Sequence, residues 1–295
     1  MANGKPTTFQ AYRKSIDDEI NQRISNHQAR IATNLALAAP PKILNLLADG
    51  DSWFDYPLSG DLPIASDVIA QLPSQFSNAP TILNLAHHGD ACTQLMGVSR
   101  RNQLFAQLTN SANGNFDALL FSGGGNDLVG EQFRLWIQDA VAAGKDPTKA
   151  VDQQAFSDIL GVVMTAYADL MALRDQVDHN IPIFVHAYDF ALPTDNGVCF
   201  LGPWLFPSLQ SRGWMAGITP PDITIGAAIV KLCLLELDKQ MLALSSAPAN
   251  NVVYVRTQGT LGPSDWANEL HPTPGGFKQI AVKFYAALAG RFGVA

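Results

Sequence analysis

The sequence has few cysteines and no long apolar run, and each absence removes a class of protein. Its 295 residues include three cysteines, Cys92, Cys199 and Cys233, which are far apart and odd in number. They fit neither a disulfide framework nor a CxxC zinc pattern, so free thiols in a reducing compartment are expected. No run of 18 or more apolar residues occurs, and a transmembrane span is therefore not expected.

The beginning of the sequence also lacks the apolar segment of a secretory signal peptide, which together with the unpaired cysteines favours a cytoplasmic location. Charged residues make up only 15% of the chain, and the net charge is −7. A nucleic-acid partner is not expected, because a surface that follows phosphates needs clustered Lys and Arg. The only pair of adjacent arginines is Arg100-Arg101, and two such residues are more typical of a solvated helix face than of a binding site.

Short apolar runs, rich in Val, Ile, Leu and Phe, alternate with helical patterns along most of the chain. The runs predict strands at 43–48, 81–86, 116–122, 182–188 and 251–257. Helical patterns lie near 65–72, 91–108, 130–143, 153–178 and 223–245, and a last helix runs from Thr273-Pro274 to about Leu288. This alternation predicts an α/β fold, with one doubly wound parallel sheet and helices on both faces.

Two segments fall outside the alternation. Residues 7–39 have apolar side chains at helical spacing, with a Thr7–Gln10 capping box, and predict one long helix that ends at Pro40-Pro41. We expect residues 1–41 to form a helical extension packed on a domain of residues 42–295, with a dimer contact as an alternative. The stretch 189–222 is rich in Pro and Gly and carries Trp204, Phe206 and Trp214, as a lid or binding loop would.

Four polar positions stand directly after predicted strands. Ser52 follows the first strand in Ala48-Asp49-Gly50-Asp51-Ser52-Trp53, and Gly89 follows the second. Asn126 follows the third and His271 the fifth. Because the carboxyl ends of parallel strands meet at one edge of a sheet, these residues are expected to converge there.

The four residues suit nucleophilic catalysis. A serine hydroxyl needs a base that takes its proton, and His271 is the candidate. The negative oxygen that forms during acyl transfer needs fixed donors, which the backbone N–H groups of Ser52 and Gly89 and the side-chain amide of Asn126 would supply.

These blocks resemble those of the SGNH (GDSL) hydrolase superfamily. The chain has Gly50-Asp51-Ser52, then Gly89, then Gly124-Gly125-Asn126-Asp127, then His271-Pro272, in the family's order, over about residues 42–292. The resemblance implies a three-layer, flavodoxin-like fold with strand order 2-1-3-4-5. It also implies that Ser52 is the nucleophile, that Gly89 and Asn126 complete the oxyanion hole, that His271 is the base, and that no cofactor is needed.

One departure from the family pattern concerns the partner of His271. The family has Asp three residues before the histidine, where this chain has Asn268. A neutral amide can fix the tautomer of the ring but offers no negative charge to an imidazolium. Asp265 is therefore the favoured partner, with Asn268 as a neutral orienting group next and a backbone carbonyl third.

Other side chains near the predicted edge are candidates for contact with substrate: Trp53, His88, His186 and Trp204. A hydrogen-bonded structural role is the favoured alternative for His186, and core packing is an equal alternative for the aromatic side chains of the loop. No metal site is expected, because the chain has no HExxH motif and Asp49-Gly50-Asp51 does not fit a calcium loop.

Taken together, these residues predict a serine esterase that cleaves carboxylic esters with small or medium acyl groups through an acyl-serine intermediate. A carbohydrate O-deacetylase, a thioesterase and a lysophospholipase are alternatives, since the same site would serve them. A catalytically weak, ligand-binding protein is the alternative from another class, because Asn268 replaces the usual carboxylate.

Overall fold

The sheet organises the whole molecule. The computed structural model describes residues 8–36, 42–56, 66–197 and 202–295. In these residues five parallel strands form one sheet of order β2-β1-β3-β4-β5, which confirms the predicted order. The strands are β1 (Asn45–Gly50), β2 (Thr81–Asn84), β3 (Ala118–Ser122), β4 (Ile183–His186) and β5 (Val252–Val255).

The burial of each strand follows from its place in the sheet. Every residue of β1, β3 and β4 is buried, as expected for central strands that are covered on both faces. The edge strands β2 and β5 contain partly exposed positions. Strand β1 starts two residues later than predicted and continues to Gly50, so the glycine of the Gly-Asp-Ser motif is still part of the sheet.

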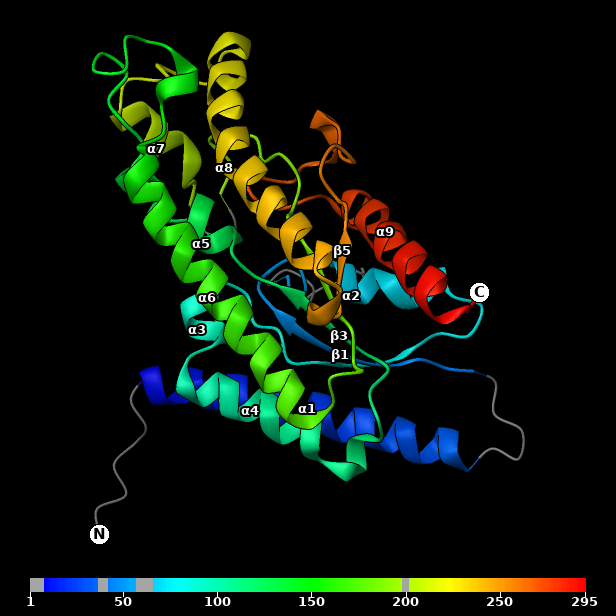
Figure 1. The fold of residues 1–295 in the computed structure, drawn as a ribbon. Coiled ribbons are helices and arrows are strands. Elements are labelled where there is room, and N and C mark those ends of the chain that lie inside the picture. Colours follow the sequence, from blue (N-terminus) through cyan, green and yellow to red (C-terminus); the bar gives the residue numbers. More distant parts are fainter. Residues whose placement is uncertain (1–7, 37–41, 57–65, 198–201) are drawn as a thin grey trace.

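Helices cover both faces (Figure 1). On one face α2 and α9 pack against each other, and on the other α4, α5 and α8 pack around α6. The helices are α1 (Thr8–Leu35), α2 (Val68–Gln71), α3 (Cys92–Leu95), α4 (Val98–Thr109), α5 (Gly125–Val129), α6 (Gln153–Val177), α7 (Leu205–Ser211), α8 (Pro220–Ser246) and α9 (Pro274–Phe292).

Helices α8 and α9 have clear start signals. Thr219 caps α8 by accepting the backbone N–H of Asp222, and Thr273 caps α9 by accepting that of Gly276. Each cap is followed by proline, whose missing N–H and fixed φ suit the first helical position. The predicted start of the last helix at Thr273-Pro274 therefore agrees with the structure.

Two predictions about local structure are wrong. Residues 130–143 do not form a helix, because Gly130 ends α5 and the chain then makes a single 3-10 turn, Phe133–Trp136, and an isolated bridge from Ile137 to Val151. The apolar side chains there are buried by turns. The stretch 189–222 is also less irregular than predicted, since it contains α7 and the start of α8.

Helix α1 lies along the edge of the sheet and contacts β2 (Figure 1). It covers most of the predicted span, while Thr7 of the predicted capping box and the end at Pro40-Pro41 lie outside the described residues. Ile20 and His27 are its buried side chains among those described. Arg23 reaches from α1 toward the ends of β1 and β2, where the predicted site lies.

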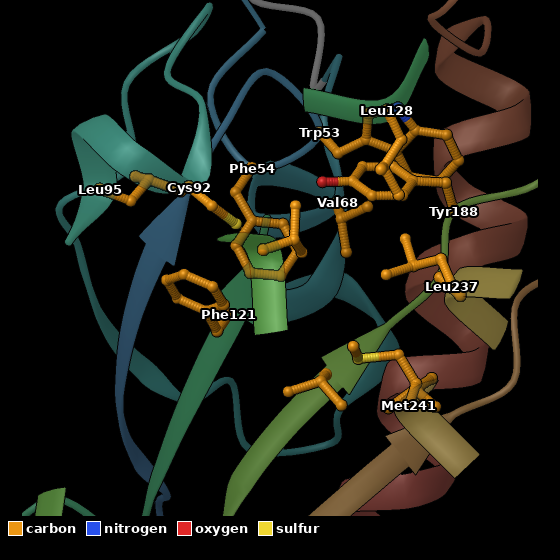
Figure 2. Packing of buried hydrophobic residues seen from close by; sticks show 14 of the residues in the cluster. Trp53, Phe54, Val68, Cys92, Leu95, Phe121, Leu128, Tyr188, Leu237 and Met241 are labelled. Atoms are coloured by element: carbon orange, nitrogen blue, oxygen red, sulfur yellow. The ribbon is translucent and has the colours of Figure 1, made fainter. Parts of the chain in front are cut away.

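The hydrophobic core fills the space between the sheet and both helix layers. Figure 2 shows part of it, including the Trp53 and Tyr188 rings, which meet edge to face at 5.1 Å between centroids. Helix α6 is the one described helix that is long and apolar enough to cross a membrane. Here it packs against α3, α4 and α5 and buries Leu160, Val163 and Leu170, as a core helix does.

Candidate active site

The serine of the Gly-Asp-Ser motif stands in a tight turn at the end of β1. Gly50 pairs with Ser122 of β3, and a Cβ atom on Gly50 would lie 2.5 Å from the Ser122 carbonyl oxygen. Only glycine permits this close approach. The chain then turns, with the N–H of Phe54 donating to the Asp51 carbonyl at 3.0 Å, and Ser52 projects from the turn.

The side chains of Ser52, His271 and Asn268 form a continuous line. The Ser52 Oγ lies 2.7 Å from the Nε2 atom of His271, and the Nδ1 atom of the same ring lies 2.9 Å from Asn268 Oδ1. All three residues are buried, with exposed fractions of 7%, 6% and 5%. The loop before α9 thus carries both His271 and its partner to the end of β1.

The backbone determines which tautomer His271 adopts. The N–H groups of Leu270 and His271 both point at the same side-chain atom of Asn268, each at 3.1 Å. Because an N–H can only donate, that atom must be the amide oxygen. The oxygen therefore accepts from the Nδ1–H of the ring, which leaves Nε2 unprotonated and ready to accept the Ser52 hydroxyl hydrogen.

Tyr56 supports the same orientation from the other side. The Nδ2 group of Asn268 donates to the Tyr56 hydroxyl oxygen at 3.1 Å. The Tyr56 ring also packs against the His271 ring, with centroids 4.9 Å apart. A flip of the Asn268 amide would set the backbone N–H groups of Leu270 and His271 against its NH₂ group, which cannot accept a hydrogen bond. The neutral side chain is thus held in the one orientation that serves a base.

The prediction that Asp265 orients His271 is wrong in this structure. The Asp265 carboxylate accepts the backbone N–H of Gly262 at 2.8 Å and closes its own turn. The Asp265 carbonyl, in turn, accepts the N–H of Thr273. Asp265 therefore shapes the loop before α9, and Asn268 is the residue that contacts the ring.

Burial and charge both act on the His271 ring. Burial lowers the pKa of His271 to about 3, and the nearby His88 adds a smaller effect in the same direction. Within the part of the chain that the structure describes, no carboxylate contacts the ring, so nothing offsets the cost of burying an imidazolium. His271 is consequently neutral at physiological pH, as a base must be before it takes a proton.

Asn126 lies beside Ser52, in the first turn of α5, and lines the same pocket. One N–H of its side-chain amide donates to the Asp90 carbonyl at 2.9 Å. The second N–H has no protein partner among the described residues. Gly89 stands next to Asp90 on the loop after β2 but does not line the pocket, so its place in the oxyanion hole stays a prediction.

A buried network fixes the turn that carries Ser52. The Asp51 carboxylate accepts the hydroxyl of Ser122 at 2.8 Å and that of Tyr188 at 2.5 Å. His186 Nε2 lies 2.9 Å from the Ser122 Oγ, and the N–H of Tyr188 donates to His186 Nδ1 at 3.2 Å. His186 is fully buried and does not line the pocket, so its predicted contact with substrate is wrong and the structural alternative holds.

Two buried carboxylates join the loops on either side of the pocket. Glu269, between Asn268 and His271, accepts the backbone N–H groups of residues 204–206 at the start of α7, at 2.6 to 2.8 Å. Asp189, after β4, accepts those of residues 259–261 after β5 at 2.7 to 2.8 Å. The segment after β4 and the segment after β5 thus each donate backbone N–H groups to a carboxylate of the other. These charge-assisted hydrogen bonds hold the loop that carries His271 in place.

Two arginines hold the loop after β2. Arg100 of α4 donates to the Leu85 carbonyl and the Asp49 carboxylate, and Arg23 of α1 donates to the Ala86 carbonyl and the Asp55 carboxylate. The predicted solvated role of Arg100 is therefore wrong, because its side chain is engaged and only 18% exposed. Both clamps act on the segment that leads to Gly89.

The pocket itself is narrow and mostly apolar. Twelve residues line it: Asp51, Ser52, Trp53, Gly125, Asn126, Val129, Tyr188, Asp189, Ala191, Leu234, Leu270 and His271. Of the predicted substrate contacts only Trp53 is among them. His88 instead stacks on His87 and approaches Asp55, whereas Trp204 and Phe206 pack half-buried against the core.

The remaining loop aromatic, Trp214, is buried, and its indole N–H donates to the Gln138 carbonyl at 2.7 Å. The core alternative therefore holds for this residue. Cys92 and Cys233 are free and buried, and Cys199 lies outside the described residues. Within the described part of the chain, no group of three or more His, Cys, Asp or Glu side chains could hold a metal ion.

Solved structures with a similar architecture include two lipases. The lipase Lip_vut3 from a goat rumen metagenome matches 83% of this chain and 97% of its own, at 14% identity and a TM-score of 0.51. An extracellular lipase from Streptomyces rimosus matches 84% and 99%, at 15% identity and a TM-score of 0.51. The chain has the fold of the SGNH hydrolases.

A lipolytic protein of the G-D-S-L family from Veillonella parvula is a further match, with 12% identity, a TM-score of 0.43, and coverage of 84% of this chain and 96% of that one. No family model and no curated protein matches the sequence. The SGNH fold accounts for the positions of Ser52, Asn126 and His271 at the strand ends. The sequence analysis did not predict the supporting roles of Tyr56, Asp189 and Glu269, because their hydrogen-bond partners are far away along the chain.

Proposed function

We propose that this SGNH-fold protein is a serine hydrolase that cleaves carboxylic esters. The contact between Ser52 and His271, at 2.7 Å, is the observation that carries the proposal. It pairs a hydroxyl with the unprotonated nitrogen of a ring whose tautomer the Asn268 oxygen holds. A nucleophile, a base and an orienting group within hydrogen-bond reach are the signature of covalent catalysis.

The reaction follows from these positions. The Ser52 Oγ attacks the ester carbonyl carbon while its proton passes to His271 Nε2, and the Asn126 amide donates to the oxyanion. His271 then gives the proton to the leaving alcohol, which departs and leaves an acyl-serine. Water attacks this ester in the same way, with His271 as base, and releases the carboxylic acid and free Ser52.

The neutral Asn268 makes this site different from one with a carboxylate. It fixes the ring and its tautomer but does not stabilise the imidazolium that forms in the transition state by opposite charge. We therefore expect a lower kcat than a carboxylate at position 268 would permit, and a His271 ring that stays unprotonated far below neutral pH.

The test is turnover of an activated acetate ester by the wild type, Ser52→Ala and Asn126→Ala. Ser52→Ala should abolish turnover, and Asn126→Ala should lower kcat about 10²–10³-fold because one oxyanion donor is lost. Circular dichroism checks that both variants fold. Full turnover in folded Ser52→Ala, or activity that a chelator removes and a divalent metal restores, contradicts the proposal.

A further inference from the structure

The pocket beside Ser52 has very little free space. Its free volume is about 20 Å³, hardly more than a single water molecule requires. The side chains of Ser52, Asn126 and His271 line the pocket together with Asp51 and Asp189, and the rest of the lining is mostly apolar. An acyl group on Ser52 that occupies this pocket must fit within these walls.

Two of the apolar walls come from helices. Val129 lies three residues after Asn126 on α5, and therefore on the same side of that helix. Leu234 comes from α8, which packs against α5. Their exposed fractions are 4% and 0%, so both side chains are part of the core as well as of the pocket. A core at native packing density leaves them no room to withdraw.

The wall formed by Tyr188 is equally constrained. Its hydroxyl donates to the Asp51 carboxylate, and its ring packs so closely on α5 that a Cβ atom on Gly125 would lie 2.7 Å from it. The backbone of Tyr188 has a φ of 57°, a strained value for a bulky residue. Trp53 contacts the same ring and donates its indole N–H to the Leu270 carbonyl at 3.1 Å.

We propose that the substrates are acetyl esters, and that Val129 and Leu234 impose this limit. The inference rests on the proposed acyl-serine mechanism. The methyl of an acetyl group on Ser52 matches the free space, whereas each further methylene must displace a buried side chain. The alcohol part of the substrate leaves toward solvent and is not restricted in this way.

The test compares kcat/KM for the acetate, butyrate and octanoate esters of one alcohol, so that only the acyl part changes. The wild type should prefer acetate to butyrate by at least about tenfold, since one methylene in a tight apolar pocket changes kcat/KM about 10–200-fold. Leu234→Ala and Val129→Ala should each shift that preference at least about tenfold toward butyrate. Leu242→Ala, at a position on α8 that is 43% exposed, is the matched control and should leave it unchanged.

A fluorophosphonate probe separates this inference from the function on which it rests. If Ser52 is labelled and butyrate is cleaved as well as acetate, the acetyl limit is overturned while the serine mechanism stands. If Ser52 is not labelled and no ester is cleaved, both fail. Where Leu234→Ala does not fold, the wild-type series and Val129→Ala still decide, and an unchanged preference in folded Val129→Ala contradicts its assigned role.

Discussion

Replacing Asn268 by aspartate should change the pH dependence of catalysis. The ring of His271 and the side chain of residue 268 are 2.9 Å apart, which puts the charges of an imidazolium and a carboxylate about 4 Å from each other. With an effective dielectric constant of about 20, their attraction is about 4 kcal/mol. That corresponds to about 3 pKa units, so the pKa of His271 should rise from about 3 to about 6.

The assay is kcat/KM for an acetate ester between pH 4 and 9, with circular dichroism at each pH to confirm folding. In the wild type the activity should persist below pH 6 until the protein unfolds, because His271 stays neutral. In Asn268→Asp it should fall as the pH drops through about 6, since protonated His271 cannot act as a base. Above that pH the variant should equal or exceed the wild type, because the new carboxylate stabilises the imidazolium.

Two further variants complete this test. Asn268→Ala removes the acceptor for the ring and should lower kcat by up to about 10⁴-fold, the loss known for a triad with the wrong tautomer. Asp265→Asn is the matched control, since Asp265 caps its own turn. It should leave kcat and the acid limb, the fall of kcat/KM at low pH, nearly unchanged. The same acid limb in the wild type and Asn268→Asp would refute the reasoning, and so would a large loss of kcat in Asp265→Asn alone.

Three other predictions concern packing and support. Gly125→Ala sets a Cβ atom 2.7 Å from the Tyr188 ring, so urea unfolding should show a loss of about 1–3 kcal/mol, and an unchanged stability would contradict this packing. Arg23→Met should lower the free energy of unfolding by a similar amount and should also lower kcat. Lys14 forms an exposed ion pair on the same helix, so Lys14→Met should change neither quantity. Burial lowers the pKa of His186 to about 3, so neutral His186 stabilises the fold above pH 6.5 and this contribution is lost as the pH falls. Urea unfolding of the wild type and His186→Gln at pH 7.5 and 5 checks this. The difference in their free energies of unfolding should be about 2 kcal/mol smaller at pH 5.

The apolar runs were sufficient to predict the strands and the convergence of Ser52, Asn126 and His271, and the family resemblance supplied the strand order. Central parallel strands are apolar on both faces, so they are visible as short runs, and their carboxyl ends must share one edge. The helix predicted at 130–143 failed although Phe133, Trp136 and Ala140 have helical spacing, because Gly130 ends α5 and turns then bury these side chains. Periodicity cannot distinguish a helix from turns that bury the same side chains.

The family's spacing points to position 268 as the partner of His271, but the prediction favoured Asp265 because residue 268 is a neutral asparagine. Asp265 and Asn268 are both close to His271 in sequence, and an ionised carboxylate is the stronger partner for a histidine. Which one meets the ring depends on the turn, in which the backbone N–H groups of Leu270 and His271 bind the Asn268 oxygen. The tyrosine that supports Asn268 is 212 residues away, at Tyr56, and no local pattern indicates such a contact.

The most direct test of the account is to treat the protein with a fluorophosphonate and to locate the adduct by peptide mass spectrometry. The probe reacts with an activated serine and needs no knowledge of the alcohol part. We expect a single adduct on Ser52, strongly reduced labelling in folded Asn268→Ala, and none in Ser52→Ala. An unlabelled wild type, or an adduct on a serine other than Ser52, would contradict the proposal that Ser52, His271 and Asn268 form a working catalytic unit.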